Sequence, residues 1–190
     1  MLTFFSKQII LKQGLLVMKK SMKIFILFIL ILSCIACDES TKKLARENLK
    51  NRKPIIFMND LFRLEYAENS GAFLSLGSDS SENIHFWILR IVPVAVLTAL
   101  LFYIIFKIDK MDKMKLISFA LIFSGGFGNI FDRFFNSRLV IDFMNMGIGN
   151  LRTGIFNFAD LYITSGLILF LIASFSEERS RKNITKNKNS

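Results

Sequence analysis

The sequence is poor in the residues from which many enzyme sites are built. The whole chain contains two cysteines, one histidine, one tryptophan and two prolines. The lone His85 has no serine or cysteine placed to suggest a catalytic triad, and with Cys34 and Cys37 it cannot complete a four-ligand zinc site. A redox role would need an accessible thiolate, which an apolar helix disfavours. We therefore interpret both cysteines as small packing residues.

Acidic residues are also scarce, because 15 Asp and Glu stand against 25 Lys and Arg and leave a net charge of +10. In a soluble protein this excess would suggest nucleic acid binding, but here the basic residues flank apolar runs instead of covering an amphipathic surface. Hydrophobic residues make up 52% of the chain, which is too many for an ordinary soluble domain. We expect an integral membrane protein whose partners include membrane lipids and exclude nucleic acid.

Four apolar runs are long enough to cross a bilayer, whose core takes about 20 helical residues. They predict helices at residues 22–41, 86–106, 116–135 and 155–175. The first run spans only if its helix continues past Asp38. Alternating side chains within residues 61–76 predict a strand. The expected fold is an all-α membrane protein, a four-transmembrane-helix bundle with a small extracytoplasmic β-containing segment between helices 1 and 2.

The distribution of basic residues predicts the orientation. Basic residues exceed acidic ones by five to none in residues 1–23, by four to two in 107–115 and by five to two in 177–190. By the positive-inside rule these segments face the cytoplasm, so both termini are cytoplasmic and the connections 38–85 and 132–154 lie outside. We expect a cytoplasmic N-terminal extension at 1–21, a membrane domain at 22–175 and a basic cytoplasmic tail at 176–190, of which we expect residues 180–190 to be disordered.

The N-terminal region permits other interpretations. Lys19 and Lys23, the apolar run after them and Ser33-Cys34 also resemble a lipoprotein signal peptide. A cleaved lipoprotein would continue into a soluble domain, whereas this chain continues into three more apolar spans. Met1, Met18 and Met22 are equally good starts before the first span, and the sequence does not distinguish among them.

Polar residues border the apolar runs on one side of the membrane. Asp38 follows the first run, Asn129 and Asp132 lie near the end of the third, and Asn157 and Asp160 open the fourth. In the predicted topology all of them lie near the outer face. An Asp near a helix centre costs roughly 2.5–3.5 kcal/mol on insertion scales, so their common depth predicts one shared polar site.

Helical spacing relates several of these residues to one another. Lys42 lies four residues after Asp38, so the two side chains could pair, either within a site or as an interfacial salt bridge in which Lys42 extends toward water. Asn129 and Asp132 share a helix face, and Asp132 could pair locally with Arg133. Close helix packing explains the nearby glycines but leaves these polar residues unexplained.

The outer connections add further candidates. Asn69 before Gly71 could form only a turn, because both residue types tolerate left-handed backbone. Asp142 lies in a short apolar segment, residues 139–144, that we expect to dip back to the membrane surface, although many loop aspartates are merely solvated. If that segment brings Asp142 to Asp160, the two carboxyls cannot both ionise cheaply. One would stay protonated while the other activates water toward a carbonyl, a mechanism that needs no metal or cofactor.

Five short motifs in this order resemble the lipoprotein signal peptidase (signal peptidase II) family, from about residue 20 to residue 175. They are Asp38 to Lys42, Asn69 to Phe73, Gly128 to Arg133, Val140 to Phe143 and Phe156 to Asp160. The resemblance implies a membrane aspartic endopeptidase of the bacterial inner membrane, monomeric and without cofactor, that cleaves prolipoproteins before a diacylglyceryl-modified cysteine. It implies that Asp142 and Asp160 are catalytic. The implied supporting residues are Asp38, Lys42, Asn69, Gly71, Asn129, Asp132, Arg133 and Asn157.

The chain departs from the family pattern at a few positions. Glu39 stands where Gln is usual, Phe73 where a second Ala is common, and Ser124 and Gly126 alter a glycine-rich run. These differences bear on substrate preference more than on reaction type. The alternative function is that of a non-enzymatic small polytopic membrane protein, such as a channel subunit or assembly factor. A channel would place polar groups through the full depth of the bundle, whereas the inner halves of helices 2, 3 and 4 are apolar.

Overall fold

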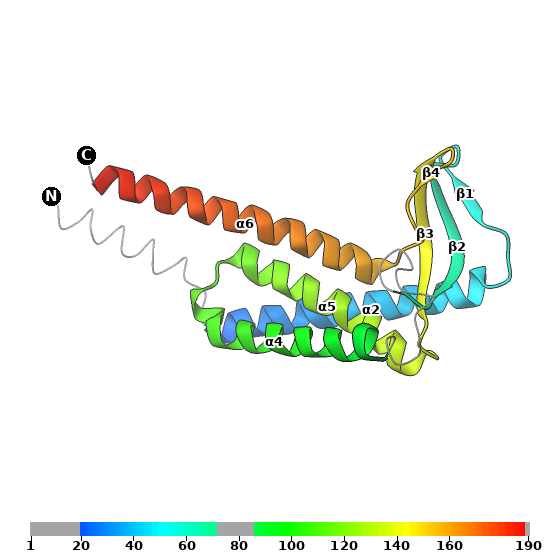
Figure 1. Cartoon of the computed structure of the whole chain (residues 1–190), viewed down its shortest axis with the longest axis horizontal. Helices are drawn as coiled ribbons and strands as arrows, with labels where there is room; N and C mark the ends of the chain where they lie inside the picture. The colour runs from blue at the N-terminus through cyan, green and yellow to red at the C-terminus, as the bar shows by residue number, and fades with distance from the viewer. Residues whose placement is uncertain (1–19, 72–85, 189–190) are drawn as a thin grey trace.

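Four long helices lie roughly along one direction, with a small sheet at one end (Figure 1). The structure, a computed structural model, describes residues 20–71 and 86–188, so the expected extension and the residues Phe73 and His85 lie outside the described part. The helices are α2 (Lys20–Leu49), α4 (Val92–Lys107), α5 (Lys113–Phe135) and α6 (Phe158–Lys188). Each belongs to a helical stretch that is long and apolar enough to cross a membrane, which confirms the predicted four-helix membrane fold.

The helices extend further than the apolar runs predicted. The first helix continues past Asp38 to Leu49, as spanning required. A turn of π-helix, η2 (Trp87–Ile91), precedes α4, and a 3-10 turn, η3 (Ile108–Lys110), follows it. The prediction of a disordered tail is wrong, because α6 continues to Lys188, and its exposed Glu178 and Lys182 form an ion pair one turn apart, at 2.7 Å.

Helix α5 packs against each of the other three helices. Gly125 permits its close approach to α6, because a Cβ there would overlap the carbonyl oxygen of Ala159. At the opposite end, the buried Lys23 Nζ donates to the carbonyl oxygens of Ile108 at 3.0 Å and Met111 at 2.7 Å. This contact joins the start of α2 to the turn between α4 and α5, and so closes the end of the bundle that lies away from the sheet.

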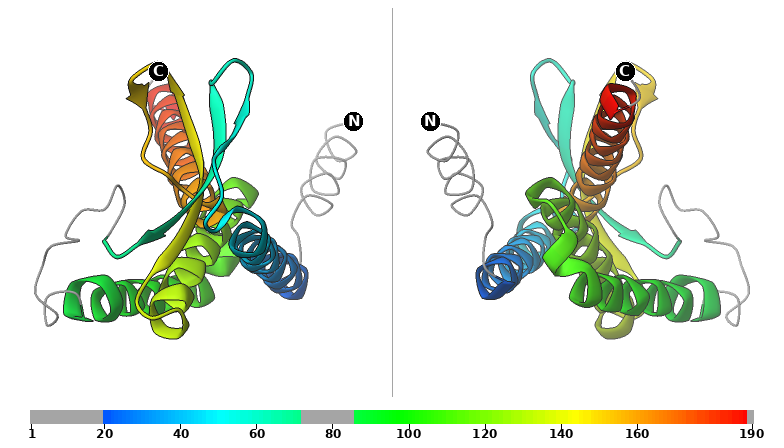
Figure 2. Two further views of the ribbon diagram at one scale, coloured as in Figure 1. Left: turned by 90° about the vertical axis from the view of Figure 1, so that its right-hand side faces the viewer. Right: turned by 90° about the vertical axis from the view of Figure 1, so that its left-hand side faces the viewer.

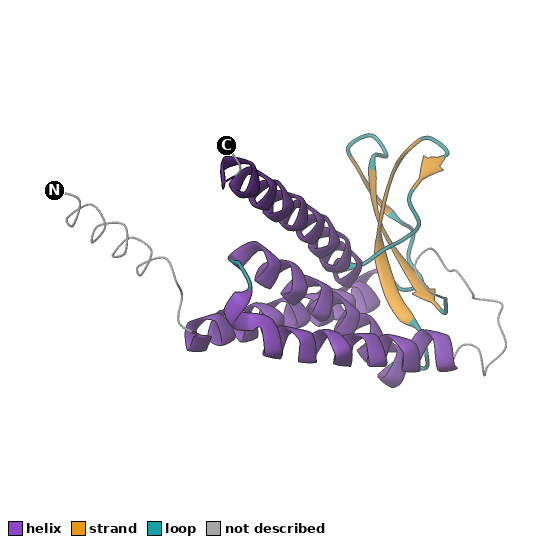
Figure 3. Cartoon of the chain, turned by 60° about the vertical axis from the view of Figure 1, so that its left-hand side comes forward, coloured by secondary structure: helices purple, strands orange, loops and turns teal. Residues whose placement is uncertain are grey.

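The sheet has four antiparallel strands in the order β1-β2-β3-β4, and its strands run across the direction of the helices (Figures 1 and 3). The connection after α2 supplies β1 (Ile55–Phe57) and β2 (Phe62–Asn69), where the sequence predicted β structure. The connection between α5 and α6 supplies β3 (Val140–Ile148) and β4 (Leu151–Arg152). The sheet therefore draws strands from both outer connections.

Most of residues 139–144, which we expected to dip back to the membrane surface, form the central strand β3. Residues 140–145 are all buried, between β2 on one edge and the β4 side on the other. Ile141 and Phe143 pack with Ala45 and Leu49, on the part of α2 that extends beyond Asp38. Burial on both faces explains the continuous apolar run, which carries no alternation to mark a strand.

Candidate active site

Asp142 and Asp160 are brought together by the meeting of β3 with the start of α6. Asp142 is buried in β3, opposite Ala67 of β2, and Asp160 lies in the first turn of α6. Asn157 connects them, because its Nδ2 donates to Asp142 Oδ1 at 2.7 Å and its Oδ1 accepts from the backbone N–H of Asp160 at 3.0 Å. In return Asp160 Oδ2 accepts from the backbone N–H of Asn157 at 3.2 Å, so the two residues also cap the helix.

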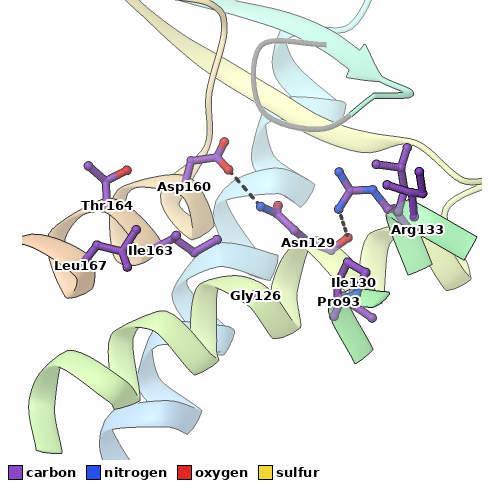
Figure 4. Close-up of a pocket in the computed structure, with 11 residues that line it drawn as sticks. Pro93, Gly126, Asn129, Ile130, Arg133, Asp160, Ile163, Thr164 and Leu167 are labelled. Carbon is purple, nitrogen blue, oxygen red and sulfur yellow. Dashed lines mark hydrogen bonds between the residues drawn. The ribbon is translucent and has the colours of Figure 1, made fainter. Parts of the chain in front are cut away.

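Two further asparagines donate to the carboxylates. Asn69 Nδ2 donates to Asp142 Oδ2 at 2.9 Å, and Asn129 Nδ2 donates to Asp160 Oδ1 at 2.9 Å (Figure 4). Asn157 Nδ2 also lies 3.2 Å from Asn129 Oδ1. Amides from β2, α5 and the start of α6 thus orient both carboxyl groups. Asn69 belongs to β2 and reaches Asp142, so it is more than a turn residue, although its Oδ1 does accept from the N–H of Gly71 at 2.9 Å.

A buried ion triad lies behind the two aspartates. Lys42 Nζ is 2.7 Å from Asp38 Oδ2 and 2.8 Å from Asp132 Oδ2, and all three side chains are at most 6% exposed. The first interaction confirms the predicted pairing of Asp38 with Lys42. The alternative in which Lys42 extends toward water is wrong, as is the local pairing of Asp132 with Arg133, because Asp132 turns to Lys42 instead.

Each carboxylate of the triad also accepts a backbone hydrogen bond next to an active-site aspartate. Asp38 Oδ1 accepts from the N–H of Ala159 at 2.9 Å, and Asp132 Oδ2 accepts from the N–H of Ile141 at 3.3 Å. Ala159 directly precedes Asp160, and Ile141 directly precedes Asp142. The triad therefore fixes the backbone of β3 and of α6 at the points from which the two carboxyl groups project.

An apolar cavity of about 480 Å³ opens beside Asp160, between η2, α4, α5 and α6. Figure 4 shows the polar groups at this cavity, with Asn129 between Asp160 and Arg133. Arg133 donates to the carbonyl oxygens of Gly71 at 2.8 Å and Asn129 at 3.3 Å. Its buried Nε has no hydrogen-bond partner among the described residues. The cavity walls are formed mainly by Ile88, Leu89, Pro93, Gly126, Ile130, Ile163, Thr164 and Leu167.

The surroundings of Asp142 favour its protonated form. Burial away from water raises the pKa of this carboxyl to about 7, and the neighbouring charge of Asp160 acts in the same direction. The hydrogen bonds from Asn69 and Asn157 oppose this shift without cancelling it. A carboxyl that keeps its proton near neutral pH can act as a general acid beside an ionised partner.

The geometry gathers every site residue that the sequence singled out into one connected network. Spacing within one helix indicated the pairs, but the partners contributed by the backbone of Ile141 and Ala159 left no signal in the sequence. The apolar cavity walls were likewise missed, because an apolar side chain in a membrane helix looks the same whether it faces lipid or a cavity.

Within the described residues, no group of three or more His, Cys, Asp or Glu side chains is placed to bind a metal ion. Cys34 is buried and Cys37 exposed, and both are free.

Comparison with known proteins identifies relatives that match most of the chain. Residues 30–176 match the family described as signal peptidase (SPase) II. The chain is 35% identical over 170 residues to the lipoprotein signal peptidase of Borreliella burgdorferi (strain ZS7), covering 86% of this chain and 98% of that protein. It is 36% identical over 166 residues to the lipoprotein signal peptidase of Francisella tularensis subsp. novicida (strain U112), with the same coverage of both.

The fold also matches a solved structure. A bacterial membrane enzyme determined by the in meso method at 2.3 Å resolution superimposes with a TM-score of 0.68 at 23% identity, covering 82% of this chain and 90% of that one. At this identity the likeness supports the fold alone. Taken with the family match over most of the sequence and the identity to its members, it leads to one conclusion: the chain belongs to the signal peptidase II family.

Proposed function

We propose that this membrane-embedded peptidase removes signal peptides from prolipoproteins with Asp142 and Asp160 as its catalytic pair. The observation that carries this assignment is the link through Asn157, which contacts both aspartates where the apolar cavity ends. In this proposal the scissile bond is the one that precedes a diacylglyceryl-modified cysteine. A buried carboxyl and an ionised one provide the acid and the base that hydrolysis of a peptide bond by water needs.

The two aspartates take complementary roles in the proposed reaction. Asp160 acts as the base and accepts a proton from a water molecule, whose oxygen bonds to the carbonyl carbon of the scissile peptide. Asp142 donates its proton to the carbonyl oxygen as the tetrahedral intermediate forms. The C–N bond then breaks, the proton held by Asp160 passes to the departing amine, and a hydroxyl proton of the intermediate returns to Asp142. Atoms and charge balance without a metal ion.

The cavity beside Asp160 suits a substrate that arrives within the bilayer. Its volume of about 480 Å³ lies within the usual range for ligand sites, roughly 300–1,000 Å³. Its walls are apolar, which favours the lipid chains of the modified cysteine or the apolar part of a signal peptide. Arg133 lines the same cavity, and its guanidinium is the group there that can bind a substrate carbonyl. Arg133 is therefore proposed as a substrate-binding residue.

The remaining network is assigned to positioning. Asp38, Lys42 and Asp132 hold the backbone before each catalytic aspartate. Asn69, Asn129 and Asn157 orient the carboxyl groups. Every one of these groups comes from a single chain, which supports a monomeric enzyme.

The topology completes the proposal. The excess of basic residues at 107–115 and 177–190 supports a cytoplasmic location for the end of the bundle that lies away from the sheet, and for both termini. The catalytic pair would then lie near the outer face of the bacterial inner membrane. The peptidase domain would comprise residues 22–175, flanked by the extension at 1–21 and by the basic tail at 176–190, most of which continues α6.

A cleavage assay with matched substrates tests this function. Purified wild type, Asp142→Asn and Asp160→Asn are reconstituted in liposomes and incubated with a diacylglyceryl-modified prolipoprotein and with its unlipidated form. We expect cleavage of the lipidated form alone, and by wild type alone, with all three proteins folded. Cleavage by either Asn variant would show that the catalytic carboxylates are others. Failure of folded wild type on both substrates would favour the non-enzymatic alternative.

A further inference from the structure

The end of the sheet that lies away from the active site is built from two hairpin turns. One turn, residues 58–61, joins β1 to β2, and the other, residues 149–150, joins β3 to β4. They lie side by side, because Gly147 N–H donates to the carbonyl oxygen of Leu61 at 2.9 Å and Arg152 Nη1 donates to that of Asp60 at 2.8 Å. We call this end, with the side chains Met58, Leu61, Ile148 and Leu151, the sheet tip.

The sheet tip exposes large apolar side chains to an unusual degree. Leu151 is 84% exposed, and Met58 and Ile148 are each 79% exposed. These values exceed that of every exposed large hydrophobic on the described helices, where Phe135 at 77% comes next. Exposed apolar side chains are expected on the helices, because those helices face lipid. Apolar side chains that are exposed even more at the sheet tip indicate that this surface does not face water alone.

The position of the sheet tip places it beside the bundle instead of above its centre. The strands run across the helices, and the β3–β4 end rises past the first turns of α6 (Figure 1). Seen along the helices, both hairpin turns project outward in the direction toward which α6 tilts (Figure 2). Helix α6 carries exposed apolar side chains such as Leu161 and Ile168, and it is long and apolar enough to span a membrane. In a spanning orientation the sheet tip would therefore project sideways, toward the membrane around the bundle (Figures 1 and 2).

The charges at the sheet tip fit a lipid surface as well. Asp60 pairs with Arg63, whose Nε is 2.5 Å from Asp60 Oδ1, and with Arg152, whose Nη1 is 3.4 Å from Asp60 Oδ2. The acidic charge is thus neutralised and one positive charge remains among these three residues. A basic group next to exposed apolar side chains is the combination by which interfacial segments bind anionic headgroups and the adjoining acyl chains.

We propose that the sheet tip inserts shallowly into the leaflet on the active-site side of the membrane and binds lipid there. An interfacial segment buries its apolar side chains about 5–10 Å into the boundary between headgroups and acyl chains. Since β3 carries Asp142 and also the tip residue Ile148, this contact fixes the depth of the sheet relative to α6 and hence to Asp160. The inference concerns a surface remote from the catalytic pair and does not depend on the proposed chemistry.

Fluorescence quenching in proteoliposomes tests the insertion directly. The single tryptophan, Trp87, is replaced by Phe in the full chain, and one new tryptophan is introduced by Ile148→Trp or, separately, Leu151→Trp. Matched positions provide the references: Val96→Trp on the lipid-facing side of α4, where Val96 is 59% exposed, and Lys43→Trp on α2 beyond Asp38, where the Lys43 side chain is 76% exposed. Lipids brominated at successive acyl positions then report depth.

We expect both tip tryptophans to be quenched most by lipids brominated nearest the headgroup, and Val96→Trp, in the middle of its span, to be quenched most by lipids brominated deep in the acyl chain. Both losses should be much larger than that of Lys43→Trp. Tip tryptophans that are quenched no more than Lys43→Trp would overturn the proposal and favour a protein partner or water at this surface. Melting temperature and cleavage activity establish that each variant is folded. If the tip tryptophans are quenched in protein whose melting temperature matches that of wild type, this inference stands even where wild type itself cleaves neither substrate and the proposed function fails.

Discussion

Asp38 on α2 accepts a hydrogen bond from the backbone N–H of Ala159 on α6 at 2.9 Å, across 121 residues of sequence. The same carboxylate pairs with Lys42, which pairs in turn with Asp132, the acceptor for the backbone of Ile141. One buried ammonium group thus lies between two carboxylates that each hold a strand or helix carrying a catalytic candidate. The relative position of Asp142 and Asp160 therefore depends on the charges of Asp38, Lys42 and Asp132, which need not touch the substrate.

Replacing Lys42 with Met is therefore expected to destabilise the enzyme severely. The substitution leaves Asp38 and Asp132 buried without their cation, and breaking a buried ion pair by removing one partner costs about 3–5 kcal/mol. Thermal unfolding in detergent measures the loss. Lys50→Met is the matched control, because Lys50 pairs with Glu68 at 2.7 Å on a surface where its side chain is 46% exposed, and such exposed pairs contribute little to stability.

The neutral combination Asp38→Asn, Lys42→Met and Asp132→Asn should recover part of the stability that Lys42→Met alone loses. It removes all three charges while each Asn retains an oxygen that can accept the backbone N–H. Equal instability of the single and the triple variant would contradict the assignment of the cost to uncompensated charge.

Gly128→Ala is expected to lower both stability and activity. A Cβ at this position would overlap Asp38 Oδ2, so Asp38 would have to move away from Lys42 or from Ala159. Overpacking of this kind costs typically about 1–3 kcal/mol. Gly126→Ala, two residues away on α5, is the control for stability, because its Cβ would meet the flexible end of Leu97, with Cδ2 at 2.8 Å. Unfolding curves that shift equally for both variants would show that the contact with Asp38 is not the cause.

Sequence reasoning succeeded where a pattern is local. The long apolar runs predicted the four helices, and the spacing of three residues between Asn157 and Asp160 correctly placed both at one helix end, where they cap each other. It failed where the partner is distant. Lys42 and Asp132 are far apart in the chain, and nothing local distinguishes that pairing from one between Asp132 and the adjacent Arg133.

Strand β3 was missed for a different physical reason. An exposed strand alternates, but residues 140–145 are buried throughout, so their apolar run resembles a segment that enters the membrane. Their burial depends on the extension of α2 to Leu49 and on pairing with β2, both of which are tertiary features. The sequence offered Asp142 as a candidate partner of Asp160, and the resemblance to a family strengthened that hypothesis, but the motif alone did not predict the strand that carries Asp142.

Activity should fall on the alkaline side as Asp142 loses its proton, with an apparent pKa near 7. Asn69 Nδ2 stabilises the ionised carboxylate, so Asn69→Ala should raise the pKa of Asp142 and move this limb to higher pH. The pH profile of kcat for the lipidated substrate measures the shift. A limb that moves to lower pH, or does not move, would mean that another group controls it.

Stability should depend on the same group, and it should fall in the same direction of pH as activity. The pKa of Asp142 rises from an ordinary value of 3.8 to about 7 on folding, so between these values the folded state binds more protons than the unfolded state. The free energy of unfolding therefore falls as pH rises through this window and levels off above it. Asp142→Asn removes the titration, so the melting temperature of this variant should depend less on pH between about 4 and 7 than that of wild type.

Arg133→Lys should weaken substrate binding more than it slows the chemical step. Lysine keeps the positive charge but loses the planar guanidinium, which lines the cavity and donates to the Gly71 carbonyl at 2.8 Å. We expect KM for the lipidated substrate to rise about tenfold, which corresponds to about 1.4 kcal/mol and is the size of one lost hydrogen bond to a charged group. Asn129→Ala provides the contrast, because it frees Asp160 Oδ1 and should act on kcat. An Arg133→Lys variant with unchanged KM and reduced kcat would transfer this arginine from substrate binding to the support of the catalytic pair.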